Sequence, residues 1–497
     1  MGPVLPGKDA EAVAARDGRI VAAGDAREAA RALDGDAERV DCAGGVLLPA
    51  FIDAHIHLLS YAASLRSVDC TRARSIAEIQ GALRERAGST PAGSWVRAFG
   101  YEETQLAERR HPNRHDLDAA APDHPVRLIH RSGHASVLNS LALRKVGIDI
   151  ATEDPPGGYM ERDTATGEPS GFLLGMEQLI DGTVPPIPYA DLSSAVREAC
   201  DRLLAAGISC VQDATHTNGR SEWELFARLI EDGAMSVDAV VMEGIDHLGE
   251  LPEHGASGRL RRGPVKIMLH ETDGGFAPDE DELRRMVAEV HGAGRQAAVH
   301  AVGEQAVAAA FRAIEAALQS RPRKDHRHRI EHCGLLPEGL APRLAERGIA
   351  VVSQPGLLYE RGERYLQLIP PGQLERLYAY RTLSEARVDI AAGSDAPVTP
   401  PEPLASVAAA AGRQTEAGRF VGAAQAVEIG EALRWWTSGA ARAAFLEGER
   451  GLVRPGLRAD LALLPAGALE RRPAELRRLR VERLWRAGRE LVLASAQ

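Results

Sequence analysis

The sequence predicts an α/β fold built on a parallel (β/α)8 barrel of the TIM type. Three observations support this prediction. Short apolar runs end in histidine, lysine or aspartate, helical patterns separate several of these runs, and 497 residues are enough for a large barrel with smaller additional parts. The clearest helical patterns run from Asp279 to His291 and from Glu304 to Ser320. Such alternation is typical of βα units around a parallel sheet.

The first predicted barrel strand is the apolar run from Val46 to Ala54, which leads directly into His55-Ile56-His57. Residues i and i+2 of a strand project to the same face, so two imidazoles would leave this strand side by side and could hold one metal ion. Because His-x-His is short, the pair could also be two ordinary polar residues at a strand end. The later strands favour the metal site.

Four later segments have the same form, a short β-rich run with one side chain that can bind a metal. The carboxyl ends of parallel barrel strands converge on one face, so residues far apart in the sequence can surround a single site. The segments are Pro264 to Leu269 with Lys266, Gln296 to His300 with His300, Arg329 to His332 with His332, and Ile390 to Asp395 with Asp395.

About 150 residues separate the first strand from the next predicted barrel strand, Gly207 to Asp213. This distance is far longer than a common βα connection, so it predicts a structured insertion rather than a loop. The insertion, at about residues 70–195, has its own strand-like run from Val126 to His130. We expect a subdomain over the barrel mouth that selects the substrate.

The two ends of the chain show a different pattern, with short strand-like runs between Gly and Asp turns. Residues 1 to about 50 contain such runs, and matching runs at 460–464 and 481–488 close the chain. Neither end could bury a core alone.

Together these segments resemble the amidohydrolase superfamily, and within it the YtcJ-like branch of metal-dependent amidohydrolases, which includes N-substituted formamide deformylases. The likeness covers nearly the whole chain, and its motifs occur in the expected order. Besides the predicted ligands, the motifs are Arg131-Ser132-Gly133-His134, Asn139 to Leu143, His300 to Glu304, Arg329 to His332, Gly393 to Val398, Gly451 to Gly456 and Ala459-Asp460-Leu461.

The resemblance implies a domain organisation and a metal centre. Residues 1–50 and 450–497 would form a small composite β-sandwich beside a barrel at 51–449. One divalent ion would be held by His55 and His57 and a second by His300 and His332, with a carbamylated Lys266 between them. Zinc is the expected metal, as one or two ions, although manganese, iron or nickel could use the same ligands. Similar enzymes are often dimers, so a homodimer is expected, but no sequence feature shows an interface.

Lys266 is notable because lysine occurs at only four positions, 8, 145, 266 and 324, among 59 basic residues. A composition that favours arginine so heavily would have placed arginine here if only positive charge were needed. A primary amine with a lowered pKa can take up carbon dioxide, and burial near a metal lowers that pKa. The alternative is a lysine that pairs with a carboxylate, since some members of the superfamily hold one metal without the bridge. His270 is either a pocket or a surface residue.

The predicted chemistry is metal-dependent hydrolysis of a non-peptide carbon–nitrogen bond in a small amide, formamide or cyclic amide. A coordinated metal lowers the pKa of water from 15.7 toward about 7. Asp395 would bind metal, act as general base and return the proton to the leaving nitrogen. One alternative is an esterase, lactonase or phosphoesterase with the same metal site. A second is a non-catalytic ligand-binding regulator.

Three residues are candidate substrate contacts. His134 belongs to the insertion, Tyr101 stands where similar proteins often carry tryptophan, and His216 follows the second barrel strand. Each could instead be a structural or packing residue. Five further histidines lie among charged or turn residues and are predicted to be exposed: His111, His115, His124, His326 and His328.

Composition limits the partners and the compartment. A net charge of −11 argues against non-specific nucleic-acid binding, which needs a concentrated basic surface, so a small amide-like molecule is the expected partner. Five cysteines without Cys-x-x-Cys spacing indicate neither a disulfide framework nor a thiolate zinc site. No apolar run approaches the roughly 20 residues of a membrane span, and no amino-terminal targeting pattern is evident. We therefore expect a cytoplasmic protein.

Overall fold

The structure, a computed structural model, describes residues 10–33, 37–155, 158–176, 179–180, 182–255, 257–272 and 275–493. The chain divides into two compact units. The first comprises Met1–Leu58 and Arg197–Gln497, and the second comprises Leu59–Val196. Each unit has its own sheet and its own buried apolar core.

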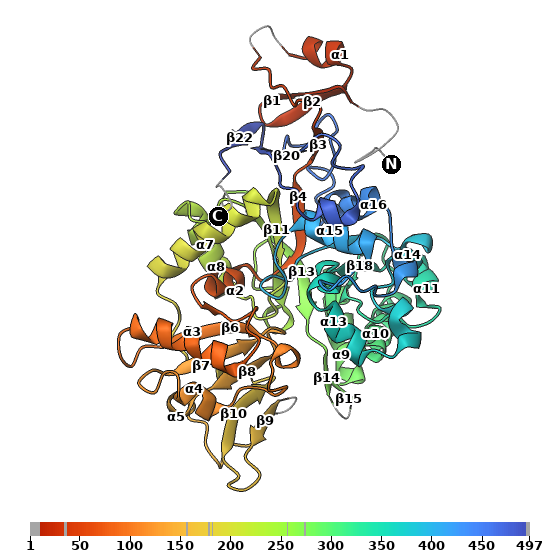
Figure 1. Cartoon of the computed structure of the whole chain (residues 1–497). Helices are drawn as coiled ribbons and strands as arrows, with labels where there is room; N and C mark the ends of the chain where they lie inside the picture. The colour runs from red at the N-terminus through yellow and green to blue at the C-terminus, as the bar shows by residue number, and fades with distance from the viewer. Residues whose placement is uncertain are drawn as a thin grey trace. The chain divides into compact units, whose positions relative to one another are not determined.

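The first unit is built around an eight-stranded sheet in which each strand pairs in parallel with the next along the sheet (Figure 1). The strand order in the sheet follows the order in the chain, as expected for successive βα units. The strands are β4 (Phe51–Ile56), β11 (Ile208–Asp213), β12 (Asp238–Gly244), β13 (Leu260–Ile267), β16 (Ala297–Ala301), β17 (Arg329–His332), β18 (Ala350–Ser353) and β19 (Ile390–Ala392).

The two edge strands, β4 and β19, approach each other through the residues that follow them. Asp395 N donates to His55 O at 2.7 Å, and His57 N donates to Ala396 O at 3.0 Å. Gly393 permits this approach, because a Cβ at that position would lie 2.4 Å from the backbone nitrogen of His55. The sheet is therefore a nearly closed barrel, and the predicted α/β barrel is confirmed.

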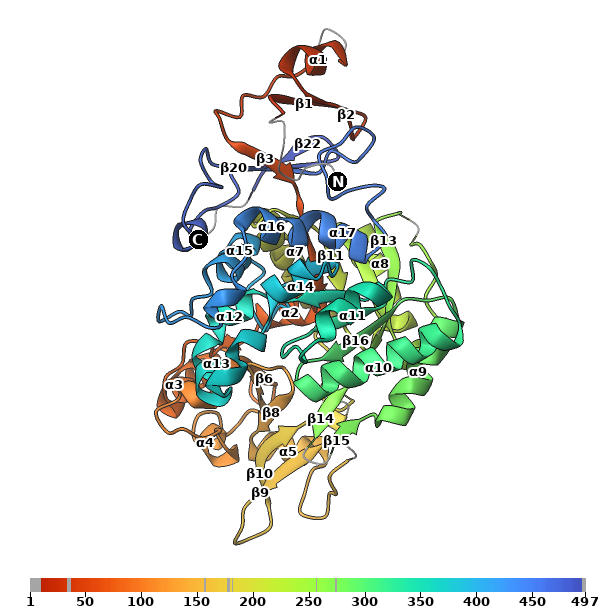
Figure 2. The same cartoon turned by 90° about the vertical axis from the view of Figure 1, so that its right-hand side faces the viewer.

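Helices lie along the outside of the barrel, and Figure 2 shows α9 (Glu280–Gly292) beside α10 (Glu304–Ser320). Both helices coincide with the sequence patterns that predicted them. Asp279 caps α9, because its side chain accepts a hydrogen bond from Glu282 N at 2.8 Å. Other helices of this unit are α8 (Arg220–Glu231), α11 (Leu340–Arg347) and α15 (Pro403–Gly412), and α7 (Tyr189–Ala205) leads into it.

Strands from both ends of the chain meet in a four-stranded antiparallel sheet. Strand β3 (Val46–Pro49) pairs with β20 (Leu461–Leu464), which continues through β21 (Arg483–Arg486) to β22 (Arg489–Leu491). The first two strands, β1 (Ala12–Arg16) and β2 (Arg19–Gly24), form a separate hairpin. An antiparallel bridge joins Arg19 to Arg458, so the hairpin also contacts the carboxyl-terminal segment.

The second unit contains a six-stranded mixed sheet and the predicted insertion at about 70–195. Its predicted strand Val126 to His130 is β7. This unit also contains helices α3 (Ile76–Gly88), α4 (Arg114–Asp118) and α5 (Ser140–Val146). The strand order is β5 (Val68–Asp69), β6 (Val96–Tyr101), β7 (Val126–His130), β8 (Ala135–Leu138), β10 (Pro169–Leu174) and β9 (Tyr159–Arg162).

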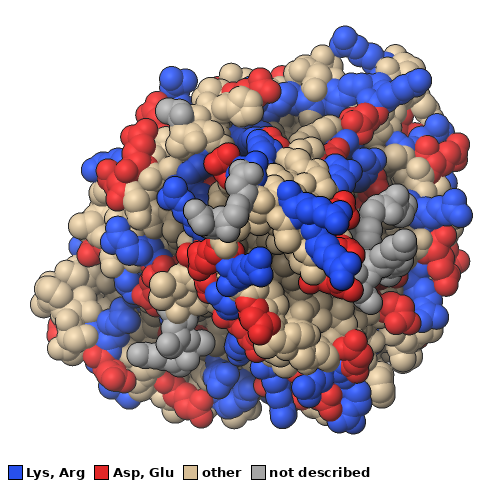
Figure 3. All heavy atoms as spheres, turned by 90° about the horizontal axis from the view of Figure 1, so that it is seen from above, with Lys and Arg blue, Asp and Glu red and all other residues tan. Residues whose placement is uncertain are grey.

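The surface carries charges of both signs. On the face seen in Figure 3, lysine and arginine side chains are interspersed with aspartate and glutamate side chains. Among the residues that the structure describes, no helix has the length and apolar character needed to cross a membrane.

Candidate metal centre

The histidine pair of the first barrel strand lies at the carboxyl end of β4. His55 is completely buried, and its ring lies 5.5 Å from that of His57, nearly at right angles. His55 Nδ1 donates to Glu331 Oε2 at 2.6 Å, and His57 Nδ1 lies 3.0 Å from Thr215 Oγ1. These contacts occupy the δ nitrogen of each ring, which leaves the ε nitrogens for other ligands.

Asp395 faces both ε nitrogens. Its Oδ1 lies 3.5 Å from His55 Nε2 and 3.2 Å from His57 Nε2. Asp395 has a φ of 58°, a left-handed conformation that is uncommon for a residue with a side chain. The hydrogen bond from Asp395 N to His55 O holds the backbone in place. One ligand atom from each of these three residues lies within 4.8 Å of the others, a spacing that suits a metal ion.

His300 and His332 lie next to this group. The ring of His332 lies 4.4 Å from that of His300 and 4.8 Å from that of His55. His332 Nδ1 donates to Gln354 Oε1 at 2.7 Å. The four predicted histidines therefore form one continuous cluster across β4, β16 and β17.

Lys266 projects from β13 and is 1% exposed. Burial lowers the pKa of its ammonium group, while the negative charges of Glu331 and Asp395 act in the opposite direction. A lowered pKa favours the neutral amine, which is the form that reacts with carbon dioxide. The structure thus brings all six predicted ligands together within the first unit.

The protonation states of the cluster suit a metal. Burial lowers the pKa of His55 well below its usual value, and burial also lowers that of His332. For Asp395, burial alone would raise the pKa, but the hydrogen bond with His57 and the electrostatic effect of the neighbouring His332, His57 and Lys266 side chains lower it overall. Neutral imidazoles and an ionised carboxylate are the forms that bind divalent ions.

His55 Nε2 provides a further test of the fit. This atom is buried, and no described residue makes a hydrogen bond with it, although Asp395 Oδ1 approaches to 3.5 Å. Leaving a buried polar nitrogen without a partner is costly. A metal ion would satisfy this nitrogen, so the residues present fit the expected group.

Glu331 supports this cluster from its edge, because its carboxylate accepts the hydrogen bond from His55 Nδ1. Glu331 also accepts a hydrogen bond from Arg329 Nε at 2.5 Å, with both side chains completely buried. Sequence reasoning missed two other supporting residues, Thr215 and Gln354. Each follows a barrel strand, but neither has a residue type that signals metal chemistry on its own.

The predicted substrate contacts occupy different units. His216 follows β11 and is half-buried, directly after Thr215 in the chain. Tyr101 and His134 belong to the second unit, where Tyr101 is completely buried and its hydroxyl lies 3.0 Å from His111 Nδ1. All three stay predictions as substrate contacts. His270 begins β14 (His270–Thr272) and is half-buried, and burial lowers its pKa.

The predicted exposure of five histidines was largely wrong. His124, His326 and His328 are buried, and His111 is half-buried; the prediction holds for His115, whose side chain is 72% exposed. The charged neighbours of His326 and His328 in the sequence do not reveal that this segment enters β17 at the base of the barrel.

A second group of ligand-type atoms occurs in the second unit. Atoms of Glu102, Glu103 and His130 lie within 4.8 Å of one another. His130 Nε2 is 2.9 Å from Glu103 Oε2 and 3.4 Å from Glu102 Oε1. His130 Nδ1 lies 3.1 Å from the Ser132 backbone N–H, which donates to it. Because this bond places the proton on Nε2, the ring donates to Glu103, and the contact is an ordinary hydrogen bond to a carboxylate.

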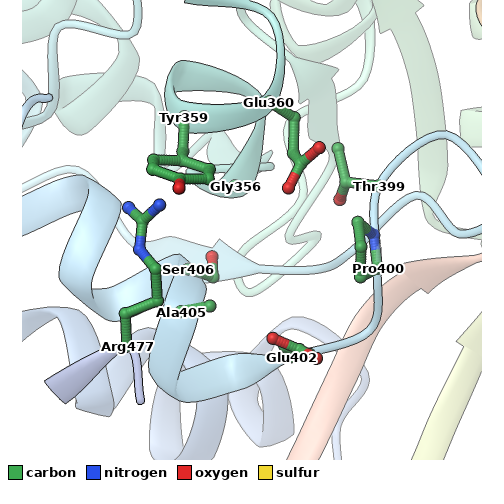
Figure 4. A pocket seen from close by; sticks show the side chains of 9 residues that line it. All are labelled: Gly356, Tyr359, Glu360, Thr399, Pro400, Glu402, Ala405, Ser406 and Arg477. Carbon is green, nitrogen blue, oxygen red and sulfur yellow. The ribbon is translucent and has the colours of Figure 1, made fainter. Parts of the chain in front are cut away.

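A cavity of about 100 Å³ lies beside α12 (Gly356–Glu360) and α15, and Figure 4 shows the side chains that line it. The guanidinium carbon of Arg477 lies 3.0 Å from the centre of the Tyr359 ring. The six predicted ligands are not part of its lining. The cavity is therefore distinct from the histidine cluster.

Comparison with known proteins identifies the family. Residues 38–492 match the model of the amidohydrolase family, Amidohydro_3. The chain belongs to the amidohydrolase family. This amidohydrolase is 30% identical to the N-substituted formamide deformylase of Arthrobacter pascens, over 96% of this chain and 94% of that protein. It is 28% identical to YtcJ of Bacillus subtilis (strain 168), over 90% of this chain and 89% of that protein.

Solved structures agree with the fold of this amidohydrolase. An uncharacterized metal-dependent hydrolase from Pyrococcus horikoshii OT3 superposes with a TM-score of 0.72 at 22% identity, covering 92% of this chain and 93% of that one. The atrazine chlorohydrolase of Arthrobacter aurescens TC1, complexed with zinc, gives 0.53 at 14% identity, with 97% and 90% covered. The expected family and enzyme class are confirmed: this amidohydrolase is a hydrolase of carbon–nitrogen bonds.

Proposed function

We propose that this amidohydrolase cleaves the carbon–nitrogen bond of a small amide, with an N-substituted formamide as the first candidate. The observation that carries the proposal is the cluster of His55, His57, His300, His332, Lys266 and Asp395. The named activity of the Arthrobacter pascens relative, which matches along nearly the whole chain, supports the choice of formamide.

His55 and His57 would hold one divalent ion and His300 and His332 a second, with a carbamylated Lys266 between the two positions. Imidazole and carboxylate donors suit zinc, and the uncommitted ε nitrogen of His55 supports this use. A bound ion supplies a Lewis acid that activates water at neutral pH and polarises the substrate carbonyl.

Asp395 would transfer a proton from the attacking water to the leaving nitrogen. Its carboxylate oxygen accepts the proton of the attacking water and returns it to the leaving nitrogen, because an amine leaves an amide readily only when it is protonated. The contacts of Asp395 with both histidines of β4 hold that oxygen beside the cluster. An ester needs less of this help, so the proton step favours an amide substrate.

The test is to compare an N-substituted formamide with the formate ester of the same substituent, and to measure released formate. The protein is assayed after chelation and after zinc is restored. The proposal predicts that zinc-dependent release is faster from the formamide. Preference for the formate ester would move the function to the alternative hydrolase class, and no formate release from either compound would favour a binding protein.

A further inference from the structure

Gln354 follows β18, a barrel strand that provides none of the six predicted ligands. Its side chain is completely buried. The carbonyl oxygen Oε1 accepts a hydrogen bond from His332 Nδ1 at 2.7 Å. The amide nitrogen Nε2 is also buried, and none of the described side chains or backbone groups accepts a hydrogen bond from it.

We propose that Gln354 is the positioning residue for His332. It keeps the proton of the ring on Nδ1, so that Nε2 faces the metal centre unprotonated. The inference rests on the proposed function, in which His332 is a ligand. A histidine ligand commonly donates its second ring N–H to an acceptor that fixes both the tautomer and the ring orientation.

The neighbouring residue holds the backbone of the same histidine. Ser353 Oγ donates to His332 O at 2.8 Å and lies 3.1 Å from the Tyr380 hydroxyl. His332 has a φ of 71°, a conformation that needs support when the residue carries a side chain. Ser353 and Gln354 therefore fix the main chain and the ring of His332 from two consecutive positions.

Three histidines of the cluster have δ-nitrogen partners that differ in charge. His55 faces the carboxylate of Glu331, His57 the hydroxyl of Thr215, and His332 the neutral amide of Gln354. A carboxylate partner fixes the tautomer and also raises the basicity of the imidazole, whereas an amide only fixes the tautomer. Replacing the amide by a carboxylate should therefore strengthen metal binding at His332.

The experiment uses the full chain loaded with cobalt, whose visible spectrum reports the ligand geometry. Gln354→Met removes the acceptor at similar side-chain length, and Gln354→Glu retains it and adds charge. The control is Ser406→Ala, because Ser406 Oγ is buried on α15 and no described group makes a hydrogen bond with it. Metal affinity is measured by competition with a chelator.

We expect Gln354→Met to lose about 10–100-fold in cobalt affinity and to change the spectrum. Gln354→Glu should bind cobalt at least as tightly as the unaltered protein. Ser406→Ala should have the affinity and the spectrum of the unaltered protein. Wild-type affinity and an unchanged spectrum in Gln354→Met would overturn the positioning role. If Gln354→Met does not fold, a loss of affinity in folded Gln354→Glu would overturn it.

A His332→Ala variant separates the two levels of the proposal. If His332→Ala loses cobalt affinity and Gln354→Met does not, the positioning role fails while the metal centre stands. If His332→Ala binds cobalt like the unaltered protein, the proposed ligand set fails and the role of Gln354 fails with it.

Discussion

Two groups of buried histidines lie at opposite ends of the barrel strands. His55 and His332, at the carboxyl end, have ring centres 4.8 Å apart, and His326 and His328, at the amino end of β17, have ring centres 4.7 Å apart. The spacing of the rings therefore does not distinguish the two groups.

The partners of the ring nitrogens do distinguish them. At the amino end, all six ring nitrogens of His291, His326 and His328 contact another group of the protein. The partners are the other ring of the His291–His328 pair at 2.8 Å, the backbone N–H groups of Ala297 and His328, and the carbonyl oxygens of Arg321 and Arg347. This network is complete without a ligand.

At the carboxyl end, the hydrogen bonding of the histidine rings is incomplete among the described residues. The δ nitrogens of His55 and His332 donate to protein acceptors, while His55 Nε2 has no hydrogen-bond partner in the described part of the chain. The comparison teaches that a buried ring nitrogen without a hydrogen-bond partner, rather than the close spacing of histidine rings, marks a site prepared for a metal.

The largest expected effect comes from Asp395→Asn. The amide cannot accept the proton of water, so kcat should fall by about 10³-fold, within the range for a lost general base. The histidines should retain much of the metal. Formate release and metal content are measured together on the same preparation, and full activity would remove Asp395 from its assigned role.

Glu331→Gln should have the next largest effect. Glutamine still accepts from His55 Nδ1 but lacks the charge that makes the imidazole more basic, so metal affinity should fall by about 10–100-fold. A chelator titration provides the measurement. Unchanged affinity would show that the charge of Glu331 serves only to pair with Arg329, which it contacts at 2.5 Å.

His328→Leu tests the other end of the barrel. The change leaves the backbone N–H of Ala297 without its acceptor, which should lower the free energy of unfolding by about 1–3 kcal/mol. Metal content and kcat should stay the same. Chemical denaturation measures the stability, and loss of metal in the folded variant would contradict the division between the two groups.

The pH dependence of stability should be the smallest effect. Burial lowers the pKa of His328 to about 2, whereas in the unfolded chain the pKa is near 6.5. Between these pH values the unfolded state binds a proton that the folded state does not bind. The contribution of neutral His328 to the free energy of unfolding is therefore complete above about pH 6.5 and decreases as the pH falls. The slope from this group cannot exceed about 1.4 kcal/mol per pH unit.

Unfolding curves between pH 7 and pH 5 provide the check for this effect. His328→Leu should show a shallower loss of stability toward acid than the unaltered protein. His115→Ala is the matched control, because that histidine is 72% exposed. Equal slopes in all three proteins would show that the amino-end group does not contribute.

Much of the barrel could be predicted from the sequence, because its signals are local. Periodicity marked α9 and α10, and the apolar run before His55 marked β4. The six ligand residues stood out because histidine, lysine and aspartate are unusual directly at the ends of buried strands. The gathering of strand ends at one face is a property of parallel barrels in general.

The supporting contacts could not be predicted in the same way, because they depend on tertiary neighbours. Thr215 reaches His57 across 158 positions in the chain, and Gln354 reaches His332 across 22. Charged surroundings made His328 look exposed, although its ring is completely buried. Local composition does not indicate which segments preceding the barrel strands pack against one another at the base of a barrel.

Anomalous X-ray diffraction from crystals of the zinc-loaded protein would test the central claim most directly. We predict a peak bound by the ε nitrogens of His55 and His57, with Asp395 beside it, and no peak among His291, His326 and His328. Zinc among the amino-end histidines, or none beside His55 and His57, would contradict the account.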